Sequence, residues 1–150
     1  MRQFQIISVG KLNNYYLEIA KNYQKLIRYE VKSSEISYSK KLPLEQIKQF
    51  EAKLIKELLI DKSYKIILNV TGQTYTSNEF AKKISNLFTS GKHVQFIIGG
   101  AFGLDQSIID LADNNLSLST MTLPHQMAKI MLLEQIYRAQ TIIENHPYHK

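Results

Sequence analysis

Two spacings of apolar residues alternate along the chain. Short, mostly apolar runs rich in β-branched residues predict strands. Between them, apolar residues recur every three or four positions, which is typical of helices with one buried face. The predicted strands span residues 4–9, 31–38, 64–70, 94–98 and 116–121. The predicted helices span residues 15–28, 44–60, 77–91, a short segment after Asp105, and about 124–143.

Strands that alternate with helices in this way predict an α/β fold of three layers with a mostly parallel sheet. Capping residues support the helix starts: Ser77 and Asp105 are expected as N-caps, and Thr122 is expected to cap a helix that opens near Pro124. The chain has no internal repeat, low-complexity tract or obvious linker. We therefore expect a single domain over residues 1–150.

Composition narrows the class of protein. The chain has no cysteine, which excludes disulfides and thiolate metal sites and fits a reducing compartment. No apolar run is long enough for a membrane span, and the first ten residues are a poor signal peptide. We therefore expect a soluble cytoplasmic protein without a membrane partner.

The positive charge of the chain is unevenly distributed. Residues 1–75 hold 13 Lys and Arg against 7 Asp and Glu, whereas residues 76–150 hold 6 against 6, so the whole net charge of +6 lies in the first half. Such a surplus favours a polyanionic partner, most often nucleic acid. A merely basic, soluble surface is the alternative.

Three glycines interrupt the chain directly after a predicted strand, in FIIGGAFGLDQ (96–106). In parallel α/β sheets, ligands bind at the carboxyl ends of the strands, where this loop lies beside LNVTGQ (68–73) and LSTMTLPHQ (118–126). The glycines do not form the G-x-G-x-x-G dinucleotide pattern, and no P-loop is present. By themselves they indicate a turn more often than a ligand site.

The third of these loops strengthens the case for a ligand. LSLSTMTLPHQMAK (116–129) mixes hydroxyl and apolar side chains ahead of a proline-started helix. A half-buried strand followed by a capped helix would look the same. The loop nevertheless offers apolar walls and backbone donors beside the glycines, which suits an adenine ring.

Four segments in this order, IIGGAFGL, LSLSTMTLPHQ, EQIYRA and the terminal NHPYHK, make the whole chain resemble the SPOUT-class methyltransferases that modify a pseudouridine of 23S ribosomal RNA. The resemblance implies a C-terminal trefoil knot, a bent S-adenosylmethionine held in the knot, and a homodimer that builds each active site from two subunits. It implies methylation of N3 of the pseudouridine in 23S rRNA of the assembled 70S ribosome. The cofactor contacts that it implies are Leu68, Gly99, Gly100, Gly103, Leu118, Ser119, Thr120, Met121, Thr122 and Leu123.

The resemblance also implies roles near the C-terminus. Tyr148 and His149, on a short polar tail, are expected to hold the target base near the partner subunit's cofactor; without the resemblance, a frayed chain end is the ordinary interpretation of such a tail. Arg138 is expected to contact RNA or the partner, although Glu134, one turn before it, could simply be its ion-pair partner. His125, after the loop proline, is a further candidate or an ordinary histidine at a helix start.

Four lysines are expected on the RNA-binding surface: Lys11, Lys40 and Lys41 from the basic first half, and Lys129 on the last helix. Related enzymes usually carry arginine at the position of Lys129, and lysine keeps the charge but not the bidentate fork. The two histidines of HPYH lack a cysteine or an acidic cluster nearby, so we expect no metal site.

Two other functions remain open from the sequence. The chain could be a non-catalytic, knotted protein that binds the ribosome and S-adenosylmethionine without transferring a methyl group. It could also be a nucleotide-binding α/β domain with a different chemistry. Bound S-adenosylmethionine without methylated product would indicate the binding protein. Competition by other nucleotides would indicate the nucleotide-binding domain.

Overall fold

Five parallel strands form one sheet in the computed structural model, which describes residues 2–150. The spatial order is β2-β1-β4-β3-β5, and every neighbouring pair is parallel. The strands are β1 (Gln3–Val9), β2 (Glu30–Ile36), β3 (Tyr64–Thr74), β4 (Val94–Ile98) and β5 (Asn114–Ser117). The predicted number of strands and the predicted parallel sheet are confirmed.

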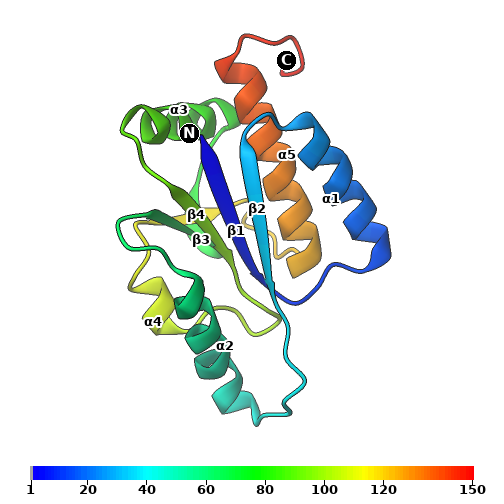
Figure 1. Cartoon of the computed structure of the whole chain (residues 1–150), viewed down its shortest axis with the longest axis vertical. Coiled ribbons are helices and arrows are strands. Elements are labelled where there is room, and N and C mark those ends of the chain that lie inside the picture. The colour runs from blue at the N-terminus through cyan, green and yellow to red at the C-terminus, as the bar shows by residue number, and fades with distance from the viewer. Residues whose placement is uncertain (1) are drawn as a thin grey trace.

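Helices cover both faces of this sheet, so the expected three layers are also confirmed (Figure 1). The helices are α1 (Asn14–Leu26), α2 (Leu44–Leu58), α3 (Ser77–Thr89), α4 (Gln106–Ile109) and α5 (His125–Ile143). Helices α1, α3 and α5 pack on one face, and α2 and α4 pack on the other. No helix within residues 2–150 has the length and apolar character needed to span a membrane.

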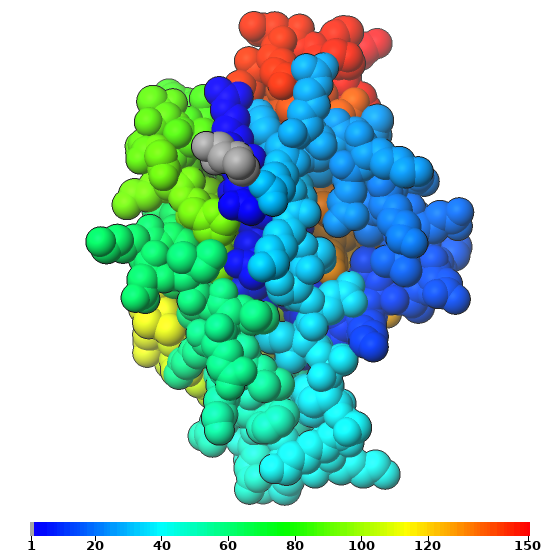
Figure 2. All heavy atoms as spheres, viewed as in Figure 1, coloured from blue at the N-terminus to red at the C-terminus, as the bar shows by residue number. Residues whose placement is uncertain are grey.

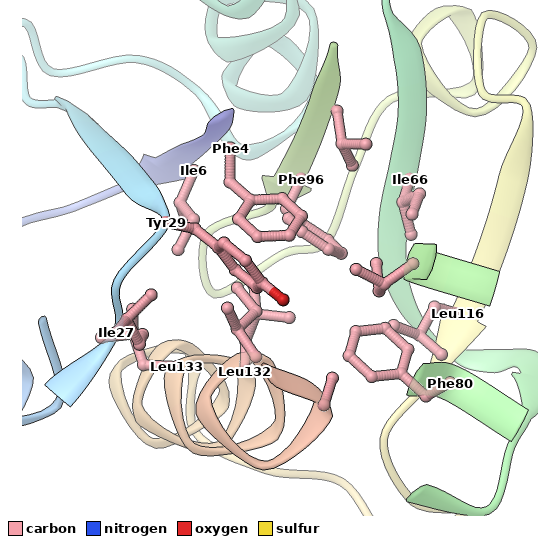
Figure 3. Packing of buried hydrophobic residues seen from close by; sticks show 14 of the residues in the cluster. Phe4, Ile6, Ile27, Tyr29, Ile66, Phe80, Phe96, Leu116, Leu132 and Leu133 are labelled. Atoms are coloured by element: carbon pink, nitrogen blue, oxygen red, sulfur yellow. The ribbon is translucent and has the colours of Figure 1, made fainter. Parts of the chain in front are cut away.

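Successive side chains of β1 point to opposite faces of the sheet, so the strand contributes to both hydrophobic clusters. Phe4 and Ile6 pack in the cluster that contains Leu132 and Leu133 of α5. Figure 3 shows these side chains meeting between the sheet and the helix. Ile7 and Val9 belong to the opposite cluster, beneath α2. Because both faces are covered, β1 and β4 at the centre of the sheet are buried almost throughout.

Two predicted helix caps are wrong by one or two residues, and one is confirmed. Thr76, rather than Ser77, caps α3 through a capping box, in which its hydroxyl accepts from the N–H of Glu79 at 3.1 Å and its own N–H donates to the Glu79 carboxylate at 2.7 Å. Pro124, rather than Thr122, occupies the N-cap position of α5. Asp105 caps α4 as expected.

The last strand was predicted over residues 116–121, but β5 begins earlier and spans Asn114–Ser117. Its neighbour β3 is irregular: Leu68 and Gln73 both pair with Leu116, so residues 69–72 bulge out of the ladder. At Gly72 a Cβ would lie 2.6 Å from the carbonyl oxygen of Asn115, so only glycine permits this close approach. The bulge carries Asn69 and Val70 to the carboxyl edge of the sheet.

Candidate active site

A cavity of about 760 Å³ opens at the carboxyl edge of the sheet. The bulged part of β3, the loops after β4 and β5 and the first turn of α5 form much of its wall, at the edge where parallel α/β sheets bind ligands. Eight of the ten expected cofactor residues line it: Leu68, Gly99, Gly100, Gly103, Leu118, Met121, Thr122 and Leu123.

The other two expected residues are in the same loop but do not line the cavity. The carbonyl oxygen of Ser119 accepts a hydrogen bond from the Ser117 hydroxyl at 2.8 Å, and its hydroxyl accepts from the N–H of Met121 at 3.1 Å. Ser119 therefore shapes the loop from within. Thr120 is exposed.

The three glycines make a tight turn and also bring bare backbone to the cavity. The N–H of Gly103 donates to the carbonyl oxygen of Gly100 at 3.0 Å, and Gly103 has a φ of +80°, in the left-handed region. A Cβ at Gly99 would lie 2.9 Å from the carbonyl carbon of Gly103. The two roles that the sequence left open, turn and ligand contact, are therefore compatible at the same residues.

Sequence reasoning missed several residues of the wall. Lys48 reaches the cavity from α2, and Asn69 and Val70 reach it through the β3 bulge. His125, a candidate from the sequence, does line the cavity, and its Nε2 would lie 3.2 Å from a Cβ at Gly10. The proline that precedes His125 was a local signal for this position, whereas no local signal marks Lys48.

The walls of the cavity suit a nucleoside better than a metal. Leu68, Ile98, Leu118 and Leu123 give apolar surface, and the glycine turn gives exposed peptide groups. Within residues 2–150 no group of three or more His, Cys, Asp or Glu side chains could hold a metal ion. A flat aromatic ring between apolar walls, with its polar edge on backbone, fits this arrangement.

A second group of candidate residues meets at the end of α5. Arg138 donates to the Glu134 carboxylate from Nη2 at 2.6 Å, and its Nη1 lies 3.1 Å from Nδ1 of His149. The Tyr148 hydroxyl donates to the same carboxylate at 3.1 Å, and the Arg138 guanidinium lies 4.9 Å from the centre of the Tyr148 ring. Glu134 is thus the ion-pair partner of Arg138, and together they order the tail.

The contacts of this cluster indicate which of its side chains donate and which accept hydrogen bonds. Burial, followed by the hydrogen bond to Glu134, raises the pKa of the Tyr148 phenol, so the hydroxyl is a donor at neutral pH. The hydrogen bonds to Glu134 raise the pKa of Arg138. Because a guanidinium has only donors, Nδ1 of His149 accepts from it, and the ring proton lies on Nε2. The tail therefore presents hydrogen-bond donors.

The cluster formed by Glu134, Arg138, Tyr148 and His149 lies at the opposite end of α5 from the cavity. Ala128, in the first turns of α5, lines the cavity, and Arg138 lies about 15 Å further along the helix axis. In Figure 1 the chain end marked C stands beyond the upper end of the sheet, whereas β1 and β2 run down toward the loop that begins α2. Within this chain, Tyr148 and His149 do not reach the cavity.

Lys129 is buried, which corrects its expected place on an RNA-binding surface. Its side chain is 4% exposed, and its ammonium donates to the Glu35 carboxylate at 3.0 Å and to the Ser8 hydroxyl at 3.2 Å. A phosphate cannot reach an ammonium held in this way. Lys129 instead ties α5 to the ends of β1 and β2.

The other three lysines expected to bind RNA are exposed. Lys11 follows β1, and Lys40 and Lys41 follow β2, so all three lie at the same edge of the sheet as the cavity. Figure 2 shows the segment between β2 and α2, in cyan, projecting from the lower end of the molecule. Its projection leaves these lysines accessible to a large partner.

Known proteins are similar to this chain over almost its entire length. A family model described as "Predicted SPOUT methyltransferase" matches residues 2–149. The ribosomal RNA large subunit methyltransferase H of Ruminiclostridium cellulolyticum is 41% identical, over 97% of this chain and 98% of that protein. The protein of the same name from Acetivibrio thermocellus is 37% identical over the same shares.

Solved structures show a similar fold. A methylase family protein from Haemophilus influenzae aligns with a TM-score of 0.60, over 98% of this chain and 70% of that chain, at 13% identity. At such low identity the likeness concerns the fold alone.

Proposed function

The chain belongs to the SPOUT methyltransferase family and is a methyltransferase of large-subunit ribosomal RNA, and we propose that it moves a methyl group from S-adenosylmethionine to N3 of a pseudouridine in 23S rRNA of the assembled 70S ribosome. The observation that carries this proposal is the cavity at the carboxyl edge of the sheet, walled by the glycine turn and loop 118–124. The ribosome as substrate places the reaction in the cytoplasm.

The residues of this cavity fit an adenosyl group. Leu68, Leu118 and Leu123 would pack on the adenine ring, and the peptide groups of Gly99 and Gly100 would approach it without an intervening side chain. When bound, S-adenosylmethionine would supply an activated methyl group for N3, leaving S-adenosylhomocysteine as the product, after N3 has given up its proton to solvent. No metal is needed, because the sulfonium already activates the methyl group.

The tail would act on the pocket of a second subunit. His149 presents its Nε2, and the Tyr148 hydroxyl is bonded to Glu134; both residues lie about three helical turns from the cavity of their own chain. We therefore propose a homodimer in which the tail of one subunit holds the target base beside the cofactor of the other. The imide N3 must lose a proton to attack, and oriented donors on the uracil carbonyls would favour that loss.

The proposal includes a trefoil knot formed by the C-terminal segment. The bulge at residues 69–72 and loop 118–124 supply much of the cavity wall together. Oγ of Ser117 joins the two segments, because it lies 3.1 Å from the carbonyl oxygen of Val70 and 2.8 Å from that of Ser119 and shares its one proton between them. A knot at this place would hold both segments as a rigid frame for a bent cofactor.

Exposed lysines at the cavity edge would bind the RNA backbone. Reversing the charge in a Lys40→Glu, Lys41→Glu double variant is expected to weaken ribosome binding and to reduce the slope of log K against log salt by about 2. Sedimentation binding at several salt concentrations measures both. A Lys82→Glu, Lys92→Glu double variant is the matched control, because both lysines are exposed and lie in other parts of the fold. An unchanged slope in the Lys40, Lys41 variant would remove these lysines from the RNA interface.

The reaction itself is tested by transfer of a tritiated methyl group to ribosomes that lack the modification, with naked 23S rRNA in parallel. We expect label in the 70S sample, mapped to N3 of one pseudouridine. Label on naked RNA alone would contradict the proposal that the assembled particle is the substrate. Bound S-adenosylmethionine without transfer to either would indicate a binding protein instead of an enzyme.

A further inference from the structure

Glu51 is a buried carboxylate directly behind the glycine turn of the cavity. It lies on α2 and is only 6% exposed. Gly100 lines the cavity, and a Cβ built on it would lie 3.3 and 3.4 Å from the two carboxylate oxygens of Glu51. Because Gly100 has no side chain, only backbone atoms of the turn separate this carboxylate from the pocket wall.

A neutral hydroxyl holds the Glu51 carboxylate, and no cation lies at ion-pair distance from it in the part of the chain that the structure describes. The Tyr38 hydroxyl donates to Oε1 at 2.7 Å, and the Tyr38 ring packs edge-on against Phe50 at 5.0 Å between centres. This hydrogen bond raises the pKa of Tyr38 to about 12, so the phenol stays a donor. Within residues 2–150 no lysine or arginine forms an ion pair with Glu51.

A buried carboxylate without a cationic partner is costly, and proteins retain such groups mainly where they serve a function. The packing of Glu51 on the turn does not itself require charge, because glutamine has the same shape and could accept the Tyr38 bond. What glutamine lacks is the carboxyl group, so the feature to be explained is a carboxyl placed behind the turn that lines the cavity.

We infer that Glu51 is a specificity-determining residue whose negative charge, acting through the Gly99–Gly100 backbone, makes the pocket prefer a cationic sulfonium ligand over its neutral thioether product. The inference rests on the proposed use of S-adenosylmethionine. The donor carries a positive sulfur, and S-adenosylhomocysteine has lost that charge together with the methyl group. In the poorly solvated wall of a pocket, a charge at short range distinguishes the two. The product would then be displaced readily by fresh donor.

The test compares the two ligands by isothermal titration on wild-type protein and on Glu51→Gln. We expect the ratio of the two dissociation constants to shift by roughly tenfold, with weaker binding of S-adenosylmethionine and at most a twofold change for S-adenosylhomocysteine. A merely structural role would weaken both ligands equally and leave the ratio unchanged. Because both constants are measured on one preparation, partial misfolding of the variant does not mimic the result.

Glu57→Gln is the matched control, since Glu57 is an exposed glutamate on the same helix and its replacement removes the same charge. It is expected to leave the ratio at its wild-type value. An equal shift in Glu57→Gln would assign the effect to net charge and overturn the inference, as would an unchanged ratio in Glu51→Gln. If wild-type protein binds neither ligand, the proposed function itself has failed.

Discussion

Replacing Gly99 with alanine is expected to weaken S-adenosylmethionine binding by at least about tenfold, because a Cβ there overpacks the turn that lines the pocket. The new atom would lie 2.9 Å from the carbonyl carbon of Gly103 and 3.0 Å from Cγ of Leu104. The backbone of Gly103 cannot yield locally, since its N–H is bonded to Gly100 at 3.0 Å. The turn must open, and the peptide groups that would meet the cofactor then move. Isothermal titration measures the loss.

Gly91→Ala is the control for this variant. Gly91 has a φ of +67° with no atom within 4 Å of a Cβ, so alanine there strains the backbone without displacing a neighbour. It follows α3, near the amino end of β4 and away from the cavity. We expect a cost of about 1 kcal/mol in unfolding free energy with binding preserved. Tight binding by a folded Gly99→Ala protein would show that the turn does not hold the cofactor.

Deleting Tyr148–Lys150 is expected to reduce methyl transfer to background while S-adenosylmethionine binding changes by less than about twofold, because truncation removes donors needed only for the target base. No residue of the tail lines the cavity, which explains the separation of the two effects. Methyl transfer to ribosomes and titration of the cofactor give the two readouts. Deleting Lys150 alone keeps Tyr148 and His149 and serves as the control. Full activity in the longer deletion would exclude a catalytic tail.

The two variants together test whether the tail acts in its own subunit or in its partner. In a mixed dimer of Gly99→Ala and tail-deleted subunits, one site combines an intact pocket with the intact tail of the other chain. The mixture is assayed at a cofactor concentration too low to fill the Gly99→Ala pocket. If tails act across the dimer, equal mixing then restores about a quarter of the wild-type activity, because half the dimers are mixed and each has one good site. If each tail serves its own pocket, the mixture stays inactive.

The order and type of the elements could be predicted because they follow from local patterns. Apolar runs identified β1, β3 and β4, a weaker alternating stretch identified β2, and the predicted last strand overlaps β5 at residues 116–117; helical spacing identified the helices between them. Errors occurred at boundaries, where neighbouring residues compete for one role. Thr76 caps α3 in place of Ser77 because its side chain forms a reciprocal pair with Glu79. The strand predicted over residues 116–121 ends at Ser117, because β5 pairs only with β3 and the chain then turns into the cavity wall.

The candidate site was predictable to the extent that its residues follow strands in sequence. Glycines and hydroxyl residues after β4 and β5 marked two walls of the cavity, and resemblance to a family supplied the cofactor and the reaction. The contribution of α2 was not predictable. Lys48 and Glu51 are spaced along an ordinary amphipathic helix, and only the packing of that helix against the sheet brings them to the glycine turn.

By itself, the sequence determined the alternation of strands and helices, the parallel sheet and the loops that form the cavity, since periodicity, capping and glycine clusters act over a few residues. Only the tertiary structure decided the rest. It buried Lys129 against Glu35, 94 positions away, and it placed Glu51 behind Gly100. It also placed Tyr148 and His149 at the far end of the molecule from the cavity. These relations depend on contacts between segments distant in the chain, and no local pattern of residues encodes such contacts.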